Sequence, residues 1–248
     1  MDTLFTGKIV HFKEETESTN DWADQEMKTS KVLEGTLFKA DSQTKGKGQR
    51  GRHWTSVAGK NILSSYVFYP SFVHVSQQFC LVKAVSLALK DVLDQYLIDK
   101  VQIKWPNDIY VNDLKIAGVL IESAMKGSMI SSSVVGIGLN VNQQLFDAKM
   151  NATSLILETG RGFDVNSVLS ELSFFLERRY LAIRANQNAA DIEYQQSLYK
   201  LDKAWEYQVG NESNRMINRG VDSLGQLLLE DEYGRTNPYG LHEARMVL

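Results

Sequence analysis

A basic, glycine-rich segment at residues 43–54, here called the basic loop, is the part of the sequence best suited to binding an anion. Residues 39–54 hold five lysines and arginines against one aspartate, a local charge of +4 in a chain of formal charge −3. Glycines let the backbone approach a ligand closely, and successive backbone N–H groups can cradle an anion. Arginines add bidentate contacts to phosphate. We therefore expect a loop that closes over a phosphate-bearing small molecule, with Trp54 offering a flat face to a ring.

Two further segments carry residues of the kinds that line ligand sites. Lys115 opens an apolar strand, where a half-buried lysine can point its ammonium group into a cleft. It follows the string Lys104-Trp105-Pro106-Asn107-Asp108, in which the residues after the proline are typical of a turn. The glycines of Gly136-Ile137-Gly138 interrupt another apolar strand, which indicates close approach of a ligand or of a second backbone.

Each segment also has a plain structural interpretation. The basic loop could be a solvated loop whose glycines only make turns. Lys115 could be an ordinary lysine at the edge of a hairpin. The glycines of Gly136-Ile137-Gly138 could serve only to let two strands pack closely. The basic loop is not a P-loop, because the string G-x-x-x-x-G-K-[ST] is absent from the sequence. It is not a dinucleotide-binding fingerprint either, because the third glycine and the following helix are misplaced.

Hydrophobic patterning sets these segments among the helices and strands of a mixed α and β chain. Ser18, followed three residues later by Asp21, is typical of a helix start, and the helix should run to about Lys28. Further helices are expected over about 76–97, from Asp164 onward and over 189–198. Strands are expected over about 35–40, 61–69, 101–105, 109–111, 115–122 and 132–139. Glycine-bearing turns beyond Tyr199 indicate a small β-barrel that must pack on the larger domain.

Composition excludes several classes of protein. The 248 residues are 43% hydrophobic and 23% charged, which is typical of globular proteins and not of disordered chains. The weakly acidic balance argues against a dedicated nucleic-acid coat. A single cysteine, Cys80, excludes an internal disulfide and a cysteine-based zinc cage. There is no secretory signal and no apolar run of about 18 residues, so we expect a cytoplasmic protein with no membrane partner.

Taken in order along the chain, these motifs resemble the biotin protein ligase family, also called biotin–[acetyl-CoA carboxylase] ligases. They are Ser18-Thr19-Asn20, the basic loop, the Lys104–Asp108 string with Lys115 and Gly118, Gly136-Ile137-Gly138-Leu139-Asn140, and Gly220-Val221-Asp222-Ser223-Leu224-Gly225. The resemblance covers nearly the whole chain. It implies an α+β catalytic domain like that of class II aminoacyl-tRNA synthetases over residues 1–198, with a mixed, mainly antiparallel sheet and helices on one side. A small SH3-like barrel would follow over residues 199–248.

The resemblance also implies an activity. Members of the family join biotin and ATP into biotinyl-5′-AMP, release pyrophosphate, and transfer biotin to one lysine of a biotin carboxyl carrier protein domain. Mg²⁺ should bridge the phosphates, without a metal site of the protein's own. A homodimer is an open expectation. The 17 residues before Ser18 are too few for the winged helix of bifunctional relatives, so no DNA binding is expected.

The resemblance assigns roles residue by residue. The chemistry is expected of Lys115, Arg52 and Asp108. The two cations would offset the charge of a carboxylate attacking a phosphate, and Asp108 is, by its position, a candidate base for the carrier lysine. Biotin should contact Ser18, Thr19, Asn20, Gln43, Lys47, Gly48, Gln49, Lys115, Gly118 and Gly138. ATP should contact Lys47, Arg50, Arg52, Trp54, Asn107, Lys115 and Asn140. Three alternatives stay open, namely a lipoate–protein ligase, a nucleic-acid-binding module, and a relative that binds biotin without catalysis.

The basic loop departs from the family pattern at two positions. Many members have arginines where this chain has Lys47 and Gln49. Because glutamine is neutral and lacks the guanidinium fork, we expect the adenylate intermediate to be held loosely. Gln49→Arg should therefore slow its release, measured as the dissociation rate of biotinyl-5′-AMP. An unchanged rate would contradict this prediction.

Overall fold

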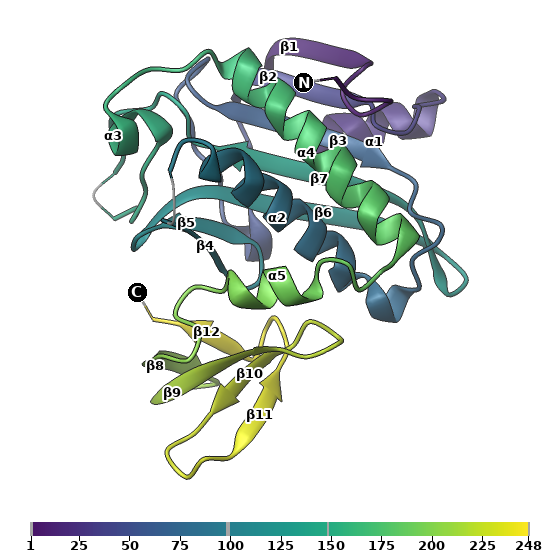
Figure 1. The fold of residues 1–248 in the computed structure, drawn as a ribbon. Coiled ribbons are helices and arrows are strands. Elements are labelled where there is room, and N and C mark those ends of the chain that lie inside the picture. The colour runs from purple at the N-terminus through teal and green to yellow at the C-terminus, as the bar shows by residue number, and fades with distance from the viewer. Residues whose placement is uncertain (1, 98–99, 148, 248) are drawn as a thin grey trace.

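The computed structural model describes residues 2–97, 100–147 and 149–247, without the side chain of Arg50, and shows an α+β protein with two sheets (Figure 1). The strands are β1 (Val10–Thr16), β2 (Leu37–Gln43), β3 (Ile62–Phe68), β4 (Val101–Lys104), β5 (Asp108–Val111), β6 (Leu114–Lys126), β7 (Met129–Leu139), β8 (Ala204–Val209), β9 (Glu212–Val221), β10 (Leu227–Glu230), β11 (Thr236–Tyr239) and β12 (Ala244–Met246). The α-helices are α1 (Thr19–Thr29), α2 (Phe79–Asp94), α3 (Leu155–Thr159), α4 (Val165–Ala185) and α5 (Asp191–Gln196), and two short 3₁₀ turns are η1 (Gln49–Gly51) and η2 (Val75–Gln77).

The large sheet holds seven strands in the order β1-β2-β3-β7-β6-β5-β4. Strands β1 and β2 pair in parallel, and the other neighbours pair antiparallel. The expected mixed, mainly antiparallel sheet is therefore confirmed. A tight turn joins β5 to β6 and so lets the two strands pair antiparallel. Its first residue, Asn112, has φ 55°, a conformation that asparagine tolerates better than most residues and that two-residue hairpin turns use.

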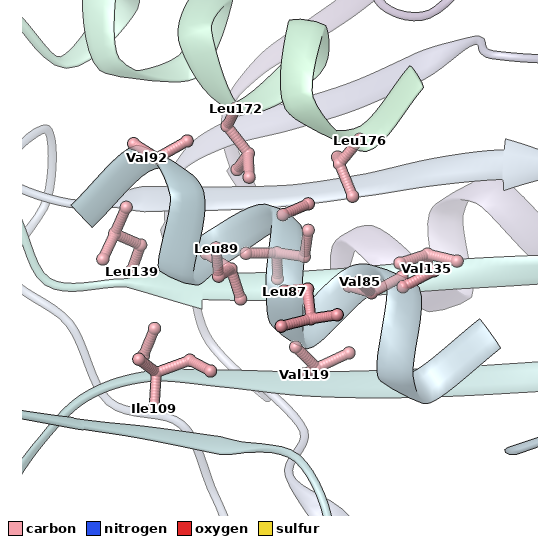
Figure 2. Close-up of a cluster of buried hydrophobic side chains, with 14 of the residues drawn as sticks. Val85, Leu87, Leu89, Val92, Ile109, Val119, Val135, Leu139, Leu172 and Leu176 are labelled. Atoms are coloured by element: carbon pink, nitrogen blue, oxygen red, sulfur yellow. The ribbon is translucent and has the colours of Figure 1, made fainter. Parts of the chain in front are cut away.

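Two helices, α2 and α4, cover one face of the large sheet. Helix α2 is buried along most of its length because apolar side chains point both to the sheet and to α4. In Figure 2, Leu87 and Leu89 of α2 lie over strand residues such as Val119, while Leu172 of α4 approaches from the other side. This layer forms the main hydrophobic core.

Helix α1 lies on the opposite face of the large sheet. Its Trp22 packs edge-on against Phe38 at 5.1 Å between ring centroids, in a separate cluster with Val67 and Val134. Because strand residues alternate between faces, this cluster lies opposite the α2 layer. The expectation of helices on one side thus holds for α2 and α4, whereas α1 departs from it. The start of α1 is as expected, since the Ser18 side chain accepts from the Asp21 backbone N–H.

The second sheet is antiparallel, in the order β11-β10-β9-β8-β12, and lies beside α5, on the side of the large sheet where β4 is the edge strand (Figure 1). Within the described residues β11 and β12 are its edges and do not pair, so the expected closed barrel is not confirmed. Among the hydrogen bonds that attach this sheet, Trp105 Nε1 donates to the Gly225 carbonyl at 2.9 Å, and Val221 N donates to Gln195 Oε1 at 3.0 Å. The division at residues 198/199 stays a prediction.

None of the helices among the described residues is long and apolar enough to cross a membrane.

The packing of α4 makes a direct prediction about stability. Leu172 is 0% exposed between α4 and α2, so Leu172→Ala should lower the free energy of unfolding by about 2–5 kcal/mol. Ser170→Ala, at an exposed position of the same helix, should change it by less than about 0.5 kcal/mol. Urea unfolding followed by circular dichroism measures both. Equal effects would show that α4 does not pack as described.

Candidate active site

A cavity of about 180 Å³ lies on the α1 face of the large sheet, between the basic loop and the second sheet. Fourteen of the residues expected from the sequence to form the site line it. They are Ser18, Thr19, Asn20, Gln43, Lys47, Gly48, Gln49, Arg52, Trp54, Asn107, Asp108, Lys115, Gly118 and Gly138. The structure thus brings segments of α1, the basic loop, β5, β6 and β7 together around one space. The individual roles of these residues stay predictions.

Three glycines, Gly118, Gly136 and Gly138, form the sheet side of the cavity and are here called the glycine floor. Gly118 and Gly138 are partners across β6 and β7. A β-carbon on Gly138 would lie 2.4 Å from Cε2 of Trp54, and one on Gly136 would lie 2.3 Å from Oδ1 of Asn20. Since real β-carbons do not approach other atoms that closely, only glycine admits these two side chains.

Hydrogen bonds fix the polar end of the cavity beside the start of α1. Gln43 Oε1 accepts from the Thr19 backbone N–H at 2.7 Å and from its hydroxyl at 3.1 Å. The Asn20 amide donates to Glu122 Oε2 at 2.6 Å, and its oxygen accepts from the Ser65 hydroxyl at 2.6 Å. These contacts present an ordered set of donors and acceptors, as recognition of a small polar ring requires.

An ion pair between Lys115 and Asp108 lines the cavity. Lys115 Nζ is 2.6 Å from Asp108 Oδ1, and the side chains are 29% and 20% exposed. Asp108 pairs with Gly118 across β5 and β6, so no side chain opposes it. Lys115 Nζ also lies 5.5 Å from the ring centroid of Trp54. The pair is thus half-buried, reachable by a ligand and covered by an aromatic ring.

Two expected nucleotide-binding asparagines make backbone contacts. The Asn107 amide donates to the Val119 carbonyl, and Val119 N donates back to the Asn107 carbonyl at 3.3 Å. Asn107 follows a cis Trp105–Pro106 peptide and lines the cavity. The Asn140 amide donates to the Thr153 carbonyl at 3.0 Å, and Asn140 lies outside the cavity lining. Asn140 therefore holds a neighbouring loop in place and does not face this cavity.

The basic loop is folded back on itself and held against α1. Gly48 N donates to the Arg52 carbonyl at 2.7 Å, and Trp54 N donates to the Gly46 carbonyl at 2.9 Å. Lys47 forms an ion pair with Asp21 of α1, and this hydrogen bond raises the pKa of Lys47. Arg52 is exposed at the edge of the cavity. The side chain of Arg50 lies outside the described residues.

Several lining residues were not expected from the sequence. Gly136 and Lys104 lie inside motifs that sequence analysis singled out, and a close reading of those motifs could have found them. The lining residues contributed by the second sheet had no local signal, because only the packing of the two sheets places them there. They include Tyr207, Asn218, Leu227, Ala244, Arg245 and Met246.

The described residues include no group of three His, Cys, Asp or Glu side chains that could hold a metal ion. Asp108 is the only acidic residue among those described as lining the cavity. Mg²⁺ is commonly held by phosphate oxygens of a substrate plus one or two carboxylates. The donor set therefore fits a Mg²⁺ ion carried mainly by a bound nucleotide, with Asp108 as the available protein ligand.

Comparison with known proteins gives concordant results. A model of the Biotin/lipoate A/B protein ligase family matches residues 12–140. The chain is 30% identical over 250 residues to the bifunctional ligase/repressor BirA of Bacillus spizizenii, covering 94% of this chain and 73% of the relative. It is 31% identical over 208 residues to the biotin–[acetyl-CoA-carboxylase] ligase of Mycobacterium tuberculosis, covering 82% and 76%. The structure of a biotin protein ligase from Aquifex aeolicus in complex with biotin and ATP matches with a TM-score of 0.80 and 25% identity, covering 97% of this chain and all of that one.

The glycine floor makes a prediction that a spectrum can check. Gly138→Ala places a methyl group where the Trp54 indole lies, so the ring should move toward water and its emission should shift to longer wavelength. Gly162→Ala is the control, because a β-carbon there would meet its nearest neighbour at 3.7 Å. Since the chain has four tryptophans, Trp54→Phe in the Gly138→Ala background should abolish the shift. A shift that persists in the double variant would contradict the described contact.

Proposed function

Because the chain belongs to the Biotin/lipoate A/B protein ligase family, we propose that it attaches biotin to a lysine of a biotin carboxyl carrier protein domain, using ATP. Biotin and ATP would first form biotinyl-5′-AMP and pyrophosphate. The biotinyl group would then pass to the carrier lysine, with release of AMP. The Mycobacterium tuberculosis relative and the solved structure described above carry biotin in their names, which supports biotin as the acid.

The observation that carries the proposal is the half-buried Lys115–Asp108 pair, which lines the same cavity as the basic loop and the polar residues at the start of α1. Thr19, Asn20 and Gln43 at the polar end offer both donors and acceptors, which suits the cyclic urea of biotin. Trp54 over the glycine floor suits an aromatic base or an alkyl chain. The carboxylate of biotin would then lie near Lys115.

In the first step a carboxylate oxygen of biotin attacks the α-phosphorus of ATP, and the bond from that phosphorus to the bridging oxygen breaks. Pyrophosphate leaves with the electron pair. Two anions must meet, so Lys115 and Arg52 would neutralise charge on the α-phosphoryl oxygens. Asp108 would orient the Lys115 ammonium through their 2.6 Å contact. Mg²⁺, when bound with the nucleotide, would supply further neutralisation of the phosphate charge.

In the second step the amine of the carrier lysine attacks the carbonyl carbon of the mixed anhydride, and the bond from that carbon to the AMP oxygen breaks. The attacking amine must lose a proton. Asp108 is the proposed acceptor, since it is the only described carboxylate that lines the cavity. The basic loop, folded over the site, would keep water from the adenylate before the carrier arrives.

The experiment that tests the proposal is ATP–pyrophosphate exchange with biotin, with lipoate, or with neither acid. Exchange should depend on biotin, and Lys115→Ala should lower its rate roughly 100- to 1,000-fold, as loss of a group that stabilises the transition state does. Lys126→Ala, at an exposed position of the same strand, is the matched control and should leave the rate unchanged.

The other outcomes decide between alternatives. Exchange that depends on lipoate would keep the fold and replace the substrate. Absence of exchange with either acid in folded protein would reject the ligase proposal. Biotin binding without exchange would favour a relative that binds biotin without catalysis.

A further inference from the structure

A line of hydrogen-bonded side chains runs from the surface of the large sheet to the polar end of the cavity, and is here called the relay. It consists of Glu122 on β6, Asn20, Ser65 on β3, Thr19 and Gln43. Thr19, Asn20 and Gln43 line the cavity, whereas Glu122 and Ser65 do not. Glu122 is exposed, and Ser65 is fully buried. Neither of these two side chains takes part in the two chemical steps derived above.

The orientation of the Asn20 amide is set by acceptors on one side of it. Its Nδ2 donates to Glu122 Oε2 at 2.6 Å and to the Leu120 carbonyl at 3.4 Å. Because a carboxylate and a carbonyl can only accept, the amide must turn its N–H groups toward them. Its oxygen then faces Ser65 Oγ at 2.6 Å, in the space left by the missing β-carbon of Gly136. The contact with Glu122 is the shorter of the two and the one to a charged group, so it is the stronger constraint.

This orientation limits where the protons of two hydroxyl groups can lie. Ser65 Oγ is 2.6 Å from Asn20 Oδ1 and 2.7 Å from Thr19 Oγ1. Thr19 Oγ1 is in turn 3.1 Å from Gln43 Oε1. Each hydroxyl has one proton, and the amide oxygens at the two ends have none, so two protons serve three contacts. One of the three contacts must therefore lack a proton.

The longest contact, between Thr19 Oγ1 and Gln43 Oε1, is the one without a proton. Gln43 Oε1 already accepts from the Thr19 backbone N–H at 2.7 Å, so it depends least on the hydroxyl. Ser65 then donates to Asn20, and Thr19 donates to Ser65. The Thr19 hydroxyl oxygen is left with both lone pairs unused by these neighbours. Because Thr19 lines the cavity, this oxygen can accept from N–H groups of a ligand.

The opposite orientation of the Asn20 amide would reverse this polarity. With its N–H groups toward Ser65, the amide would start a chain of donations that ends at Gln43 and fills all three contacts. The Thr19 oxygen would then accept from Ser65 and have one lone pair fewer for a ligand. Since the reversed state satisfies the hydroxyl groups better, the acceptors at Glu122 and Leu120 are what exclude it.

We propose that Glu122 is a positioning residue that sets the hydrogen-bond polarity of the polar end of the cavity, so that Thr19 accepts from N–H groups of the substrate. It acts through Asn20 and Ser65 and does not touch the substrate. This inference rests on the proposed function, because the cyclic urea of biotin supplies those N–H groups. The ring of lipoate has no N–H group and would leave the Thr19 oxygen unpaired, which disfavours it.

The test is biotin-dependent ATP–pyrophosphate exchange by the full chain, with kcat and with KM for biotin and for ATP. Glu122→Gln keeps the shape of the side chain but adds an N–H donor, so the Asn20 amide loses its fixed orientation. The KM for biotin should rise about three- to tenfold, since Glu122 is exposed and water partly replaces its contact. The KM for ATP and kcat should stay within about twofold, because only the binding of biotin is weakened. Glu14→Gln, exposed on β1 outside the cavity lining, is the charge-matched control and should leave all three values unchanged.

A double-mutant cycle checks that Glu122 acts through Asn20. Asn20→Ala should itself raise the KM for biotin, and adding Glu122→Gln to it should cause no further rise. The other available route is charge, because the pKa of Lys47 is raised first by its hydrogen bond to Asp21 and further by the charge of Glu122. An effect through Lys47 would persist in the absence of the Asn20 amide.

Each outcome decides the inference. An unchanged KM for biotin in Glu122→Gln would overturn it, as would a fall in kcat alone or an equal rise in the Glu14→Gln control. A further rise in the double variant would also overturn it, because the effect would not pass through Asn20. Asn20 is buried and its variant can unfold, but Glu122 is exposed and its single variant keeps the test decisive. Absence of biotin-dependent exchange in the wild-type protein would instead count against the proposed function.

Discussion

The candidate site depends on one steric constraint, which is that three neighbouring positions of the large sheet carry no β-carbon. Paired strands bring Gly118 and Gly138 side by side, and Gly136 follows on the same face of β7. The Trp54 ring and the Asn20 amide then approach the backbone more closely than any side chain would permit. The glycine floor therefore determines where the basic loop lies and how Asn20 is oriented. It also leaves open space above Asp108.

The second constraint is the short segment from Lys104 to Asp108, which contacts both sheets. The five residues from Lys104 to Asp108 include Asp108, which lines the cavity, and Trp105, whose indole N–H donates to the Gly225 carbonyl. Asp222 supports this contact, because its carboxylate accepts from the backbone N–H groups of Leu224 and Gln226 at 2.9 and 2.8 Å. The Lys104–Asp108 segment, which the sequence predicts to be a turn, therefore positions the Asp108 carboxylate and also attaches the second sheet that forms the opposite side of the cavity.

Much of the fold follows from local signals. The Ser18 cap, the long apolar helices and the central strands all lie near their expected positions, because burial imposes a clear period on each. Strand β1 was missed because it is an edge strand, with Val10 and Phe12 about half exposed at 47% and 51%, and so shows no alternation. Strand β11 is short and contains Pro238, a residue type that is uncommon in strands, so its segment carries little strand signal.

The motif residues predicted most of the site, but the cavity-lining residues of the second sheet were not predicted. Residues such as Thr19, Gln43 and Lys115 gather as expected, since their segments belong to or adjoin strands of one sheet. Tyr207 and Arg245 reach the cavity only through the contact between two sheets, which no pattern within either segment records. Asn140 shows the converse, because a motif position can serve the backbone of a neighbouring loop instead of the cavity.

The order in which the cavity walls occur along the chain has a consequence for biosynthesis. The glycine floor and the basic loop belong to the first 138 residues, whereas Ala244, Arg245 and Met246 belong to β12. During translation the large sheet can begin to form while the second sheet is still being made. The cavity acquires the wall that β12 contributes only when β12 pairs with β8, so a nascent chain would hold an open groove until β12 is added.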